Sequence, residues 1–372
     1  MSKLSPAMYR LGIATAPSPD FAAAIGPIDR SRALLQLEDW YVWGGSPIAA
    51  ADGYYLFYSR WPRGTAGRDV EADGAAFDDF GGWMKHSEIA VAYADHPHGQ
   101  YRHVGTVMRG SQDLARWDTY NATNPHVRCF EGKYYLYYIA TNPGNSPEPW
   151  RSRQPTHRLR HHGGQRVGVV VADTLADLVA GRGVRSPWPL VEPDYRTTFQ
   201  MTVNPSVTQM PSGEYLMAYK AWGADGGYIT VMATSARPDG PFTVRGTALD
   251  GELQAEDPYL WFDASTARYY AIVKDFYPAQ DRARALTAQF GALALVESDD
   301  GLDWRPAQHP LVSLRELRTI DGTVIALTRL ERPQLLFDDG GVPIALNAAM
   351  SVGDPESDPT AITVNVAIPL NW

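Results

Sequence analysis

The sequence has a single cysteine, Cys129, no excess of basic residues, and no run approaching the ~18 apolar residues of a membrane-spanning helix. One cysteine excludes an intrachain disulfide and a thiolate metal cluster. Because Val127 and Phe130 flank it with apolar groups, we expect Cys129 to be a small buried side chain and not a nucleophile. A net charge of −9 argues against general nucleic-acid affinity, since phosphate contacts need a basic face.

The first residues, 1–6, include a lysine, but no continuous apolar run follows it. This pattern differs from that of a secretory signal, so we expect a cytoplasmic protein with no membrane partner. No cofactor motif is recognised, and the composition leaves the oligomeric state open.

Aromatic residues, glycine and proline are abundant, with 20 Tyr, 11 Trp, 33 Gly and 28 Pro among 372 residues. Hydrophobic residues make up 44% of the chain and charged residues only 20%, which is ample for a large buried core. This mixture is typical of many short strands joined by tight turns.

Five segments repeat one pattern: a proline, a few apolar residues, a turn, and then an alternating strand that is rich in tyrosine in most copies. The five prolines lie 53 to 80 residues apart and are Pro47, Pro125, Pro205, Pro258 and Pro333. Each copy predicts a β-hairpin, and a second hairpin signal follows four of them, at residues 87–92, 166–171, 228–233 and 292–296.

Two hairpins per repeat predict an all-β fold, a five-bladed β-propeller with four-stranded antiparallel blades around a central channel. We expect one domain spanning 1–372, with blades near 38–110, 111–195, 196–250, 251–315 and 316–372. A two-sheet sandwich is the structural alternative, but it does not predict five copies of the same phrase. Strand 362–367 is expected to close the ring by pairing with residues 11–14.

Residues just before the five prolines should converge on the channel, because the innermost strands of a propeller line its axis. These residues are Ser46, Asn124, Asn204, Asp257 and Arg332, with Glu256 and Glu331 one step further back. Glycoside hydrolysis needs a protonated acid and an opposing carboxylate, so we take Asp257, Glu331 and Glu256 as candidate catalytic residues. Crowded carboxylates repel, and one of the three is expected to keep its proton near neutral pH. The alternative is that an acid before a proline only caps a turn.

Several phrases resemble the five-bladed glycosidases of the glycoside hydrolase family 43 type, over most of the chain. The phrases are Tyr54–Pro62, His86–Ala90, Asn124-Pro125, Glu256-Asp257-Pro258 and Glu331-Arg332-Pro333. The resemblance implies a base aspartate in the first blade, an aspartate that tunes pKa, and a glutamate acid two residues before a later proline. Glu331 matches the acid pattern, with Glu256 second, and Asp257 matches an Asp-Pro position.

The first blade departs from that family pattern, since Ser46 stands where the base aspartate is expected. Asp39, or the pair His86 and Glu88, is a candidate replacement from another loop.

Aromatic and basic residues supply candidates for substrate binding. Aromatic side chains can stack on sugar rings, and the candidates are Trp43, Trp61, Trp83, Trp222 and Tyr277. The basic stretch 151–162 is either a solvated loop or a cover for an anionic substrate, and Arg166, Lys220 and Arg332 suit an anion as well. We expect no metal site. The full set of expected binding residues is Ser46, Trp43, His86, Glu88, Asn124, Asn204, Arg166, Lys220 and Arg332.

The function that we expect is a glycoside hydrolase acting on a small oligosaccharide, anionic if the basic stretch contributes. The long loops between blades favour cleavage at chain ends. Three alternatives stay open: a glycoside phosphorylase, a polysaccharide lyase, and a sugar-binding propeller without catalysis.

Overall fold

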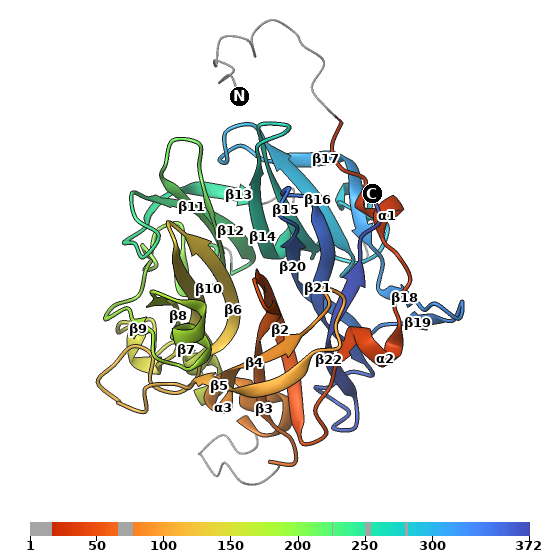
Figure 1. The fold of residues 1–372 in the computed structure, drawn as a ribbon. Coiled ribbons are helices and arrows are strands. Elements are labelled where there is room, and N and C mark those ends of the chain that lie inside the picture. The colour runs from red at the N-terminus through yellow and green to blue at the C-terminus, as the bar shows by residue number, and fades with distance from the viewer. Residues whose placement is uncertain (1–16, 66–76, 225, 250–253, 280–281) are drawn as a thin grey trace, which may run out of the picture.

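The computed structural model describes residues 17–65, 77–224, 226–249, 254–279 and 282–372. Five four-stranded antiparallel sheets stand around a centre, so the predicted five-bladed propeller is confirmed and the sandwich is excluded (Figure 1). None of the helices in these ranges is long and apolar enough to cross a membrane.

Each blade takes its strands in chain order from the channel outward, except the last. The first blade contains β2 (Trp40–Ala50), β3 (Gly53–Pro62), β4 (Glu88–Ala94) and β5 (Arg102–Met108). The second contains β6 (Thr123–Phe130), β7 (Lys133–Thr141), β8 (Gln165–Ala172) and β9 (Val184–Arg185). The third contains β10 (Phe199–Gln209), β11 (Tyr215–Trp222), β12 (Tyr228–Ser235) and β13 (Thr243–Leu249). The fourth contains β14 (Ala255–Asp263), β15 (Arg268–Asp275), β16 (Leu293–Ser298) and β17 (Arg305–Ser313).

The fifth blade joins the two ends of the described chain. Its strands are β20 (Arg329–Phe337), β21 (Pro343–Val352), β22 (Ile362–Pro369) and β1 (Leu34–Leu35). β22 was correctly expected as the closing strand, but its described partner is β1, in the register Leu34 to Val366. Residues 11–14, the partner that we expected, lie outside the described residues.

Short helices and one small hairpin complete the fold. The α-helices are α1 (Phe21–Ala24), α2 (Arg30–Ala33), α3 (Trp83–His86), α4 (His157–Gly163) and α5 (Leu175–Val179). The 3₁₀ turns are η3 (Asp79–Gly82), η4 (Pro143–Asn145) and η5 (Arg282–Arg284), and the hairpin is β18 (Glu316–Arg318) with β19 (Val324–Ala326).

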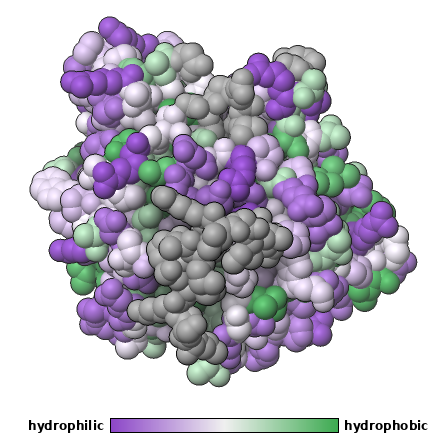
Figure 2. Space-filling view, turned by 90° about the horizontal axis from the view of Figure 1, so that it is seen from above, coloured by the Kyte–Doolittle hydropathy of each residue, from purple (hydrophilic) through white to green (hydrophobic). Residues whose placement is uncertain are grey.

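The hydrophobic core lies between neighbouring blades, because each sheet buries both faces. Leu136 and Val91 belong to the cluster between the first two blades, whereas Leu295 and Leu346 belong to the cluster between the last two. Outside these clusters, hydrophilic residues cover most of the coloured surface in Figure 2, and hydrophobic residues form small scattered groups.

Cys129 does not lie in this core: it is exposed, and our expectation of a buried side chain was wrong. It is the penultimate residue of β6 and pairs with Tyr134 next to the hairpin turn, whose residues Glu131 and Gly132 are exposed as well. Val127 and Phe130 are buried, so the apolar neighbours did not determine the orientation of the cysteine.

Each innermost strand contains a bulge at the same height of the channel. The residues just before the four prolines of blades two to five adopt left-handed backbone conformations, with φ of 51°, 57°, 58° and 56° at Asn124, Asn204, Asp257 and Arg332. Left-handed non-glycine residues are uncommon and cost free energy, so four in equivalent places show that the same bulge recurs in these blades.

Candidate active site

A cavity of about 480 Å³ opens at one end of the central channel. Residues from all five innermost strands line it: Trp43, Thr123, Asn124, Val203, Asn204, Glu256, Asp257, Arg329, Glu331 and Arg332. Strand β3, the second strands of blades three and four, the first residues of β8 and β12, and the connecting helices and loops add Trp61, Phe80, Trp83, Met84, Arg158, Leu159, His162, Gln165, Lys220, Trp222, Tyr228, Lys274, Phe276 and Glu356. The cavity is of the size typical of small-molecule sites.

The strand register identifies Glu256 and Glu331 as equivalent residues of neighbouring blades. Each is the last regularly paired residue before the bulge, with Glu256 opposite Lys274 and Glu331 opposite Ala349. Trp43, opposite Ser59, holds the same position in the first blade. The convergence of carboxylates that the prolines predicted therefore occurs.

The first blade was aligned wrongly, because the bulge there falls at Gly44 and not at Ser46. Gly44 has φ of 37° and lies between the pairs formed by Trp43 and Gly45. Ser46 lies two positions further along, below the cavity floor, where its hydroxyl donates to Gln334 Oε1 (3.1 Å). Pro47 caused this wrong alignment. In the other blades the proline directly follows the left-handed residue of the bulge, whereas Pro47 comes three residues after Gly44. The first blade consequently brings no carboxylate to the bulge position.

Below the cavity, buried polar side chains close the channel. His126 is fully buried, and its Nε2 accepts a hydrogen bond from the backbone N–H of Val207 (3.0 Å). Its Nδ1 therefore carries the proton and donates to Gln334 Oε1 (2.9 Å). Burial lowers the pKa of His126 to about 3, so this ring is neutral. The cavity is therefore closed at its lower end by these side chains and does not continue through the central channel.

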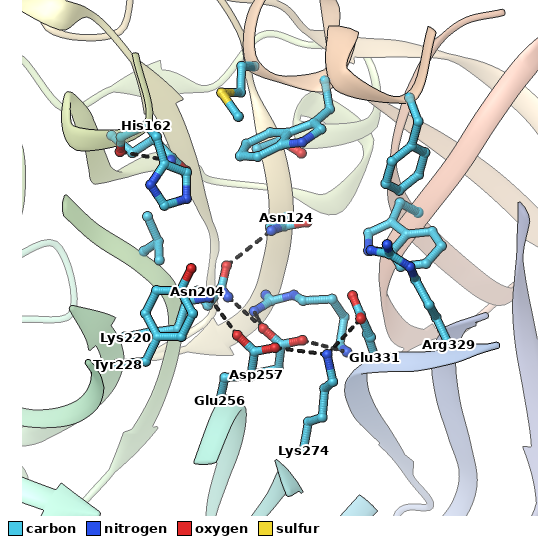
Figure 3. A pocket seen from close by; sticks show the side chains of 18 of the residues that line it. Asn124, His162, Asn204, Lys220, Tyr228, Glu256, Asp257, Lys274, Arg329 and Glu331 are labelled. Carbon is cyan, nitrogen blue, oxygen red and sulfur yellow. Dashed lines mark hydrogen bonds and ion pairs between the residues drawn. The ribbon is translucent and has the colours of Figure 1, made fainter. Parts of the chain in front are cut away.

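A chain of hydrogen bonds across the cavity floor joins four blades. Asn124 Nδ2 donates to Asn204 Oδ1 (3.0 Å), and Asn204 Nδ2 donates to Asp257 Oδ1 (2.5 Å). The backbone N–H of Arg332 donates to Asp257 Oδ2 (3.2 Å). Both oxygens of Asp257 thus accept bonds from neighbouring blades, and the side chain holds the floor together (Figure 3).

Two lysines from the second strands neutralise the glutamates. Lys220 Nζ lies 2.7 Å from Glu256 Oε2, and Lys274 Nζ lies 2.8 Å from Glu256 Oε1 and 2.7 Å from Glu331 Oε1 (Figure 3). Burial alone raises the pKa of Glu256, but the two ammonium groups outweigh it and hold that pKa well below its ordinary value. Burial lowers the pKa of each lysine, but the neighbouring acids together outweigh it, Glu256 first among them, so both lysine pKa values are raised.

Glu256 is therefore ionised at neutral pH, so it is not the one of the three acids that we expected to keep its proton. The physical reason is that cations alternate with the acids, so the carboxylates do not face one another unscreened. Glu331 contacts a single lysine, and its side chain is 15% exposed, against 9% for Glu256. Of the two glutamates, Glu331 is the more open to the cavity.

Aromatic side chains form the walls. Trp43, Trp61, Trp83 and Trp222, four of the five predicted stacking residues, line the cavity, whereas Tyr277 is buried outside the lining. Their rings give flat apolar surfaces of the kind that pack against the C–H faces of a sugar.

The basic stretch contributes α4, capped at its start by the Thr156 hydroxyl, which accepts from Leu159 N. Arg158 and His162 of this helix line the cavity. Burial lowers the pKa of His162 to about 3, helped by the charges of Lys220 and Arg158, so the imidazole is neutral. Part of the basic stretch 151–162 therefore belongs to the cavity wall.

Four predicted binding residues lie outside the cavity lining, namely Ser46, described above, and Arg166, Glu88 and His86; the alternative base Asp39 lies outside it as well. Arg166 is completely buried and donates from Nε to Glu192 Oε2 (2.6 Å) and from its other nitrogens to backbone carbonyls. Glu88 is ion-paired with Arg60 (2.7 Å), and His86 is exposed at the end of α3. Arg166 and Glu88 belong to β8 and β4, the third strands of their blades, and Asp39 is exposed before β2.

Sequence reasoning missed Arg329, Tyr228 and Phe276. Arg329 lies two residues before Glu331 on β20, so strand alternation places both on one face, and that signal was present. Its guanidinium pairs with Asp354 (2.9 Å) and Glu356 (3.1 Å). Within the described ranges, no cluster of three or more histidine, cysteine or acidic side chains is arranged to hold a metal ion.

Comparison with known proteins identifies the fold. No family model matches the sequence, and no curated protein matches it either. Among solved structures, a protein described as a glycoside hydrolase superposes with a TM-score of 0.62 at 12% identity, covering 98% of this chain and 96% of that one. Zg3597, a family 117 glycoside hydrolase from the marine bacterium Zobellia galactanivorans, gives 0.58 at 16% identity, covering 91% and 90%. A family 43 subfamily 1 enzyme from Xanthomonas citri gives 0.51 at 13% identity, covering 91% of each. The chain has the five-bladed propeller fold that these glycoside hydrolases share.

Proposed function

We propose that this protein is a glycoside hydrolase that cleaves a short oligosaccharide, with Glu331 as the proton donor. One observation carries the proposal: two glutamates from equivalent positions of neighbouring blades face a single cavity with tryptophan walls. Because the channel is closed below the cavity, the end of a sugar chain fits this cup better than its middle. The fold shared with glycoside hydrolases is consistent with this function.

The two glutamates are proposed to have different roles because their surroundings differ. Glu256, ionised by Lys220 and Lys274, supplies the negative charge that stabilises a cationic, oxocarbenium-like transition state. Glu331, which is more exposed and has a single lysine partner, protonates the leaving oxygen. Asp257 holds the floor and does not take part in the proton transfer.

The spacing of the two glutamates favours retention of configuration by two displacements. The Glu256 carboxylate attacks the anomeric carbon as Glu331 protonates the departing oxygen, and water activated by the Glu331 carboxylate then displaces Glu256 from the glycosyl ester. Their Oε1 atoms bond to the same Lys274 nitrogen and are thus at most two hydrogen-bond lengths apart. Retaining glycosidases have carboxyl groups ~5–5.5 Å apart, whereas inverting enzymes need ~6.5–9.5 Å to admit a water molecule. We expect the newly released sugar to carry the anomeric configuration of the substrate, which NMR of the fresh product measures.

The test is a screen of nitrophenyl glycosides and oligosaccharides with wild type and Glu331→Gln. We expect Glu331→Gln to lose ~10²–10⁴-fold in rate on oligosaccharides. The loss on nitrophenyl glycosides should be smaller, because nitrophenolate departs without a proton. The matched control is Glu214→Gln, at the exposed turn between β10 and β11 and outside the cavity lining. Equal losses on both substrate types, or full activity of Glu331→Gln, would refute the role of Glu331.

A sugar-binding propeller without catalysis is the second candidate, and the observation that favours it is Gly44. The bulge position of the first blade, where the family 43 pattern has its base, carries no side chain. If this candidate is correct, calorimetry detects oligosaccharide binding, and the ligand remains intact after prolonged incubation with wild type.

A further inference from the structure

A second cavity, of about 290 Å³, adjoins the candidate active site between the fourth and fifth blades. It is lined by Lys274, Phe276, Phe290, Gly291, Arg315, Thr328, Arg329, Leu330, Glu331 and Asp354. Four of these residues, Lys274, Phe276, Arg329 and Glu331, also line the first cavity. Glu331 therefore stands at the junction of two spaces.

This position has a direct consequence if Glu331 is the proton donor. A proton donor must lie within hydrogen-bond reach of the bridging oxygen, and the two sugar units extend from that oxygen in opposite directions. One unit then occupies the first cavity and the other occupies the second. The rings of Phe276 and Phe290, with centroids 5.3 Å apart, supply an apolar wall for the unit in the second cavity.

The charges around the second cavity are compensated except at Arg315. Lys274 pairs with Glu256 and Glu331, and Arg329 pairs with Asp354 and Glu356. Arg315 donates from Nη1 to the carbonyl of Thr328 (2.8 Å), and it has no acidic partner in the described part of the chain. Its Nε is buried without a hydrogen-bond partner, which is costly for a charged group unless a ligand or water pairs with it.

We propose that the second cavity binds the leaving-group unit of the substrate, and that Arg315 recognises a carboxylate on this unit. The planar guanidinium presents adjacent N–H groups that match a carboxylate, so the unit is a uronic acid. The inference rests on the proposed function for the position of the cleaved bond. The anion preference itself is a property of Arg315 and is measured without any cleavage.

Ligand-observed NMR titrations of the full chain test the proposal, with galacturonate and glucuronate as probes and galactose and glucose as their neutral counterparts. We expect wild type to bind at least one uronate about tenfold more tightly than its neutral counterpart, because a charge-assisted hydrogen bond is formed. Arg315→Gln should abolish this preference. Arg182→Gln, which replaces an exposed arginine on the loop after α5, should retain it.

Two further measurements show which cavity binds the anion and which anion it prefers. Arg158→Gln removes the cation of α4 in the first cavity; loss of the preference in this variant, with retention in Arg315→Gln, would overturn the assignment to the second cavity. Inorganic phosphate is titrated as the competing anion. If it displaces the uronate at lower concentration and accelerates cleavage, the cavity binds an attacking phosphate and the leaving-group assignment fails.

The inference and the proposed function fail separately. Cleavage of glycosides by wild type without any uronate preference refutes the Arg315 subsite and leaves the hydrolase in place. A uronate preference that depends on Arg315, in a protein that cleaves no glycoside, supports the anion site and refutes the hydrolase.

Discussion

Replacing Glu256 by glutamine removes the central charge of the buried network formed with Lys220 and Lys274. Glutamine keeps the size of the side chain, but both ammonium groups lose a carboxylate that lies 2.7 and 2.8 Å away. The two lysine side chains are only 11% and 10% exposed, so water replaces the lost partner poorly. Removing one partner of a buried ion pair typically costs ~3–5 kcal/mol, and we expect Glu256→Gln to lower the free energy of unfolding by about this amount at neutral pH.

The pH dependence of this loss follows from the pKa of Glu256, which is held below the ordinary value of 4.5 in the folded protein. In the unfolded chain the carboxyl group returns to its ordinary value. Its contribution to stability is therefore complete above a pH of about 4.5, and it is lost as the pH falls from there toward the depressed folded-state pKa. The difference between wild type and Glu256→Gln should shrink on acidification.

Urea denaturation, followed by tryptophan fluorescence, measures both effects. Glu214→Gln serves as the control, since an exposed substitution is expected to change stability by no more than about 0.5 kcal/mol. A Glu256→Gln protein as stable as the control would refute the buried charge network. A stability difference that stays constant on acidification would refute the depressed pKa.

Two other changes test the floor of the cavity and the outer surface. Gly44→Ala places a Cβ at a φ of 37° and 2.8 Å from Asn124 Oδ1, so we expect a loss of ~1–3 kcal/mol, whereas Gly105→Ala, with nothing within 4 Å, should be nearly neutral. Equal stability of the two variants in urea denaturation would contradict the bulge at Gly44. Cys129 should react with a thiol reagent in the native protein without loss of stability, because it is exposed; a thiol that reacts only after denaturation would contradict its position on β6.

Local patterns were sufficient to predict the blades. Alternation with a period of two and glycine-containing turns are properties of neighbouring residues, so the strand of Tyr134 to Tyr138 and the turn before it can be predicted without knowledge of the rest of the chain. The prolines marked the bulges of blades two to five correctly, and through them Glu256 and Glu331. Both glutamates could be predicted as site residues because the position of each one follows from the sequence pattern of its own strand.

Contacts between blades decided what the sequence alone left open. Lys220 meets Glu256 because ring closure brings β11 of the third blade beside β14 of the fourth, whereas Lys274 is the cross-strand partner of Glu256 within one hairpin. Together the two lysines keep Glu256 ionised. The bulge at Gly44 is defined by its pairing with β3, not by the proline that follows it. Burial and register depend on residues far apart in the chain, and for this reason the sequence predicted which acids meet while the tertiary structure determined the charge of Glu256.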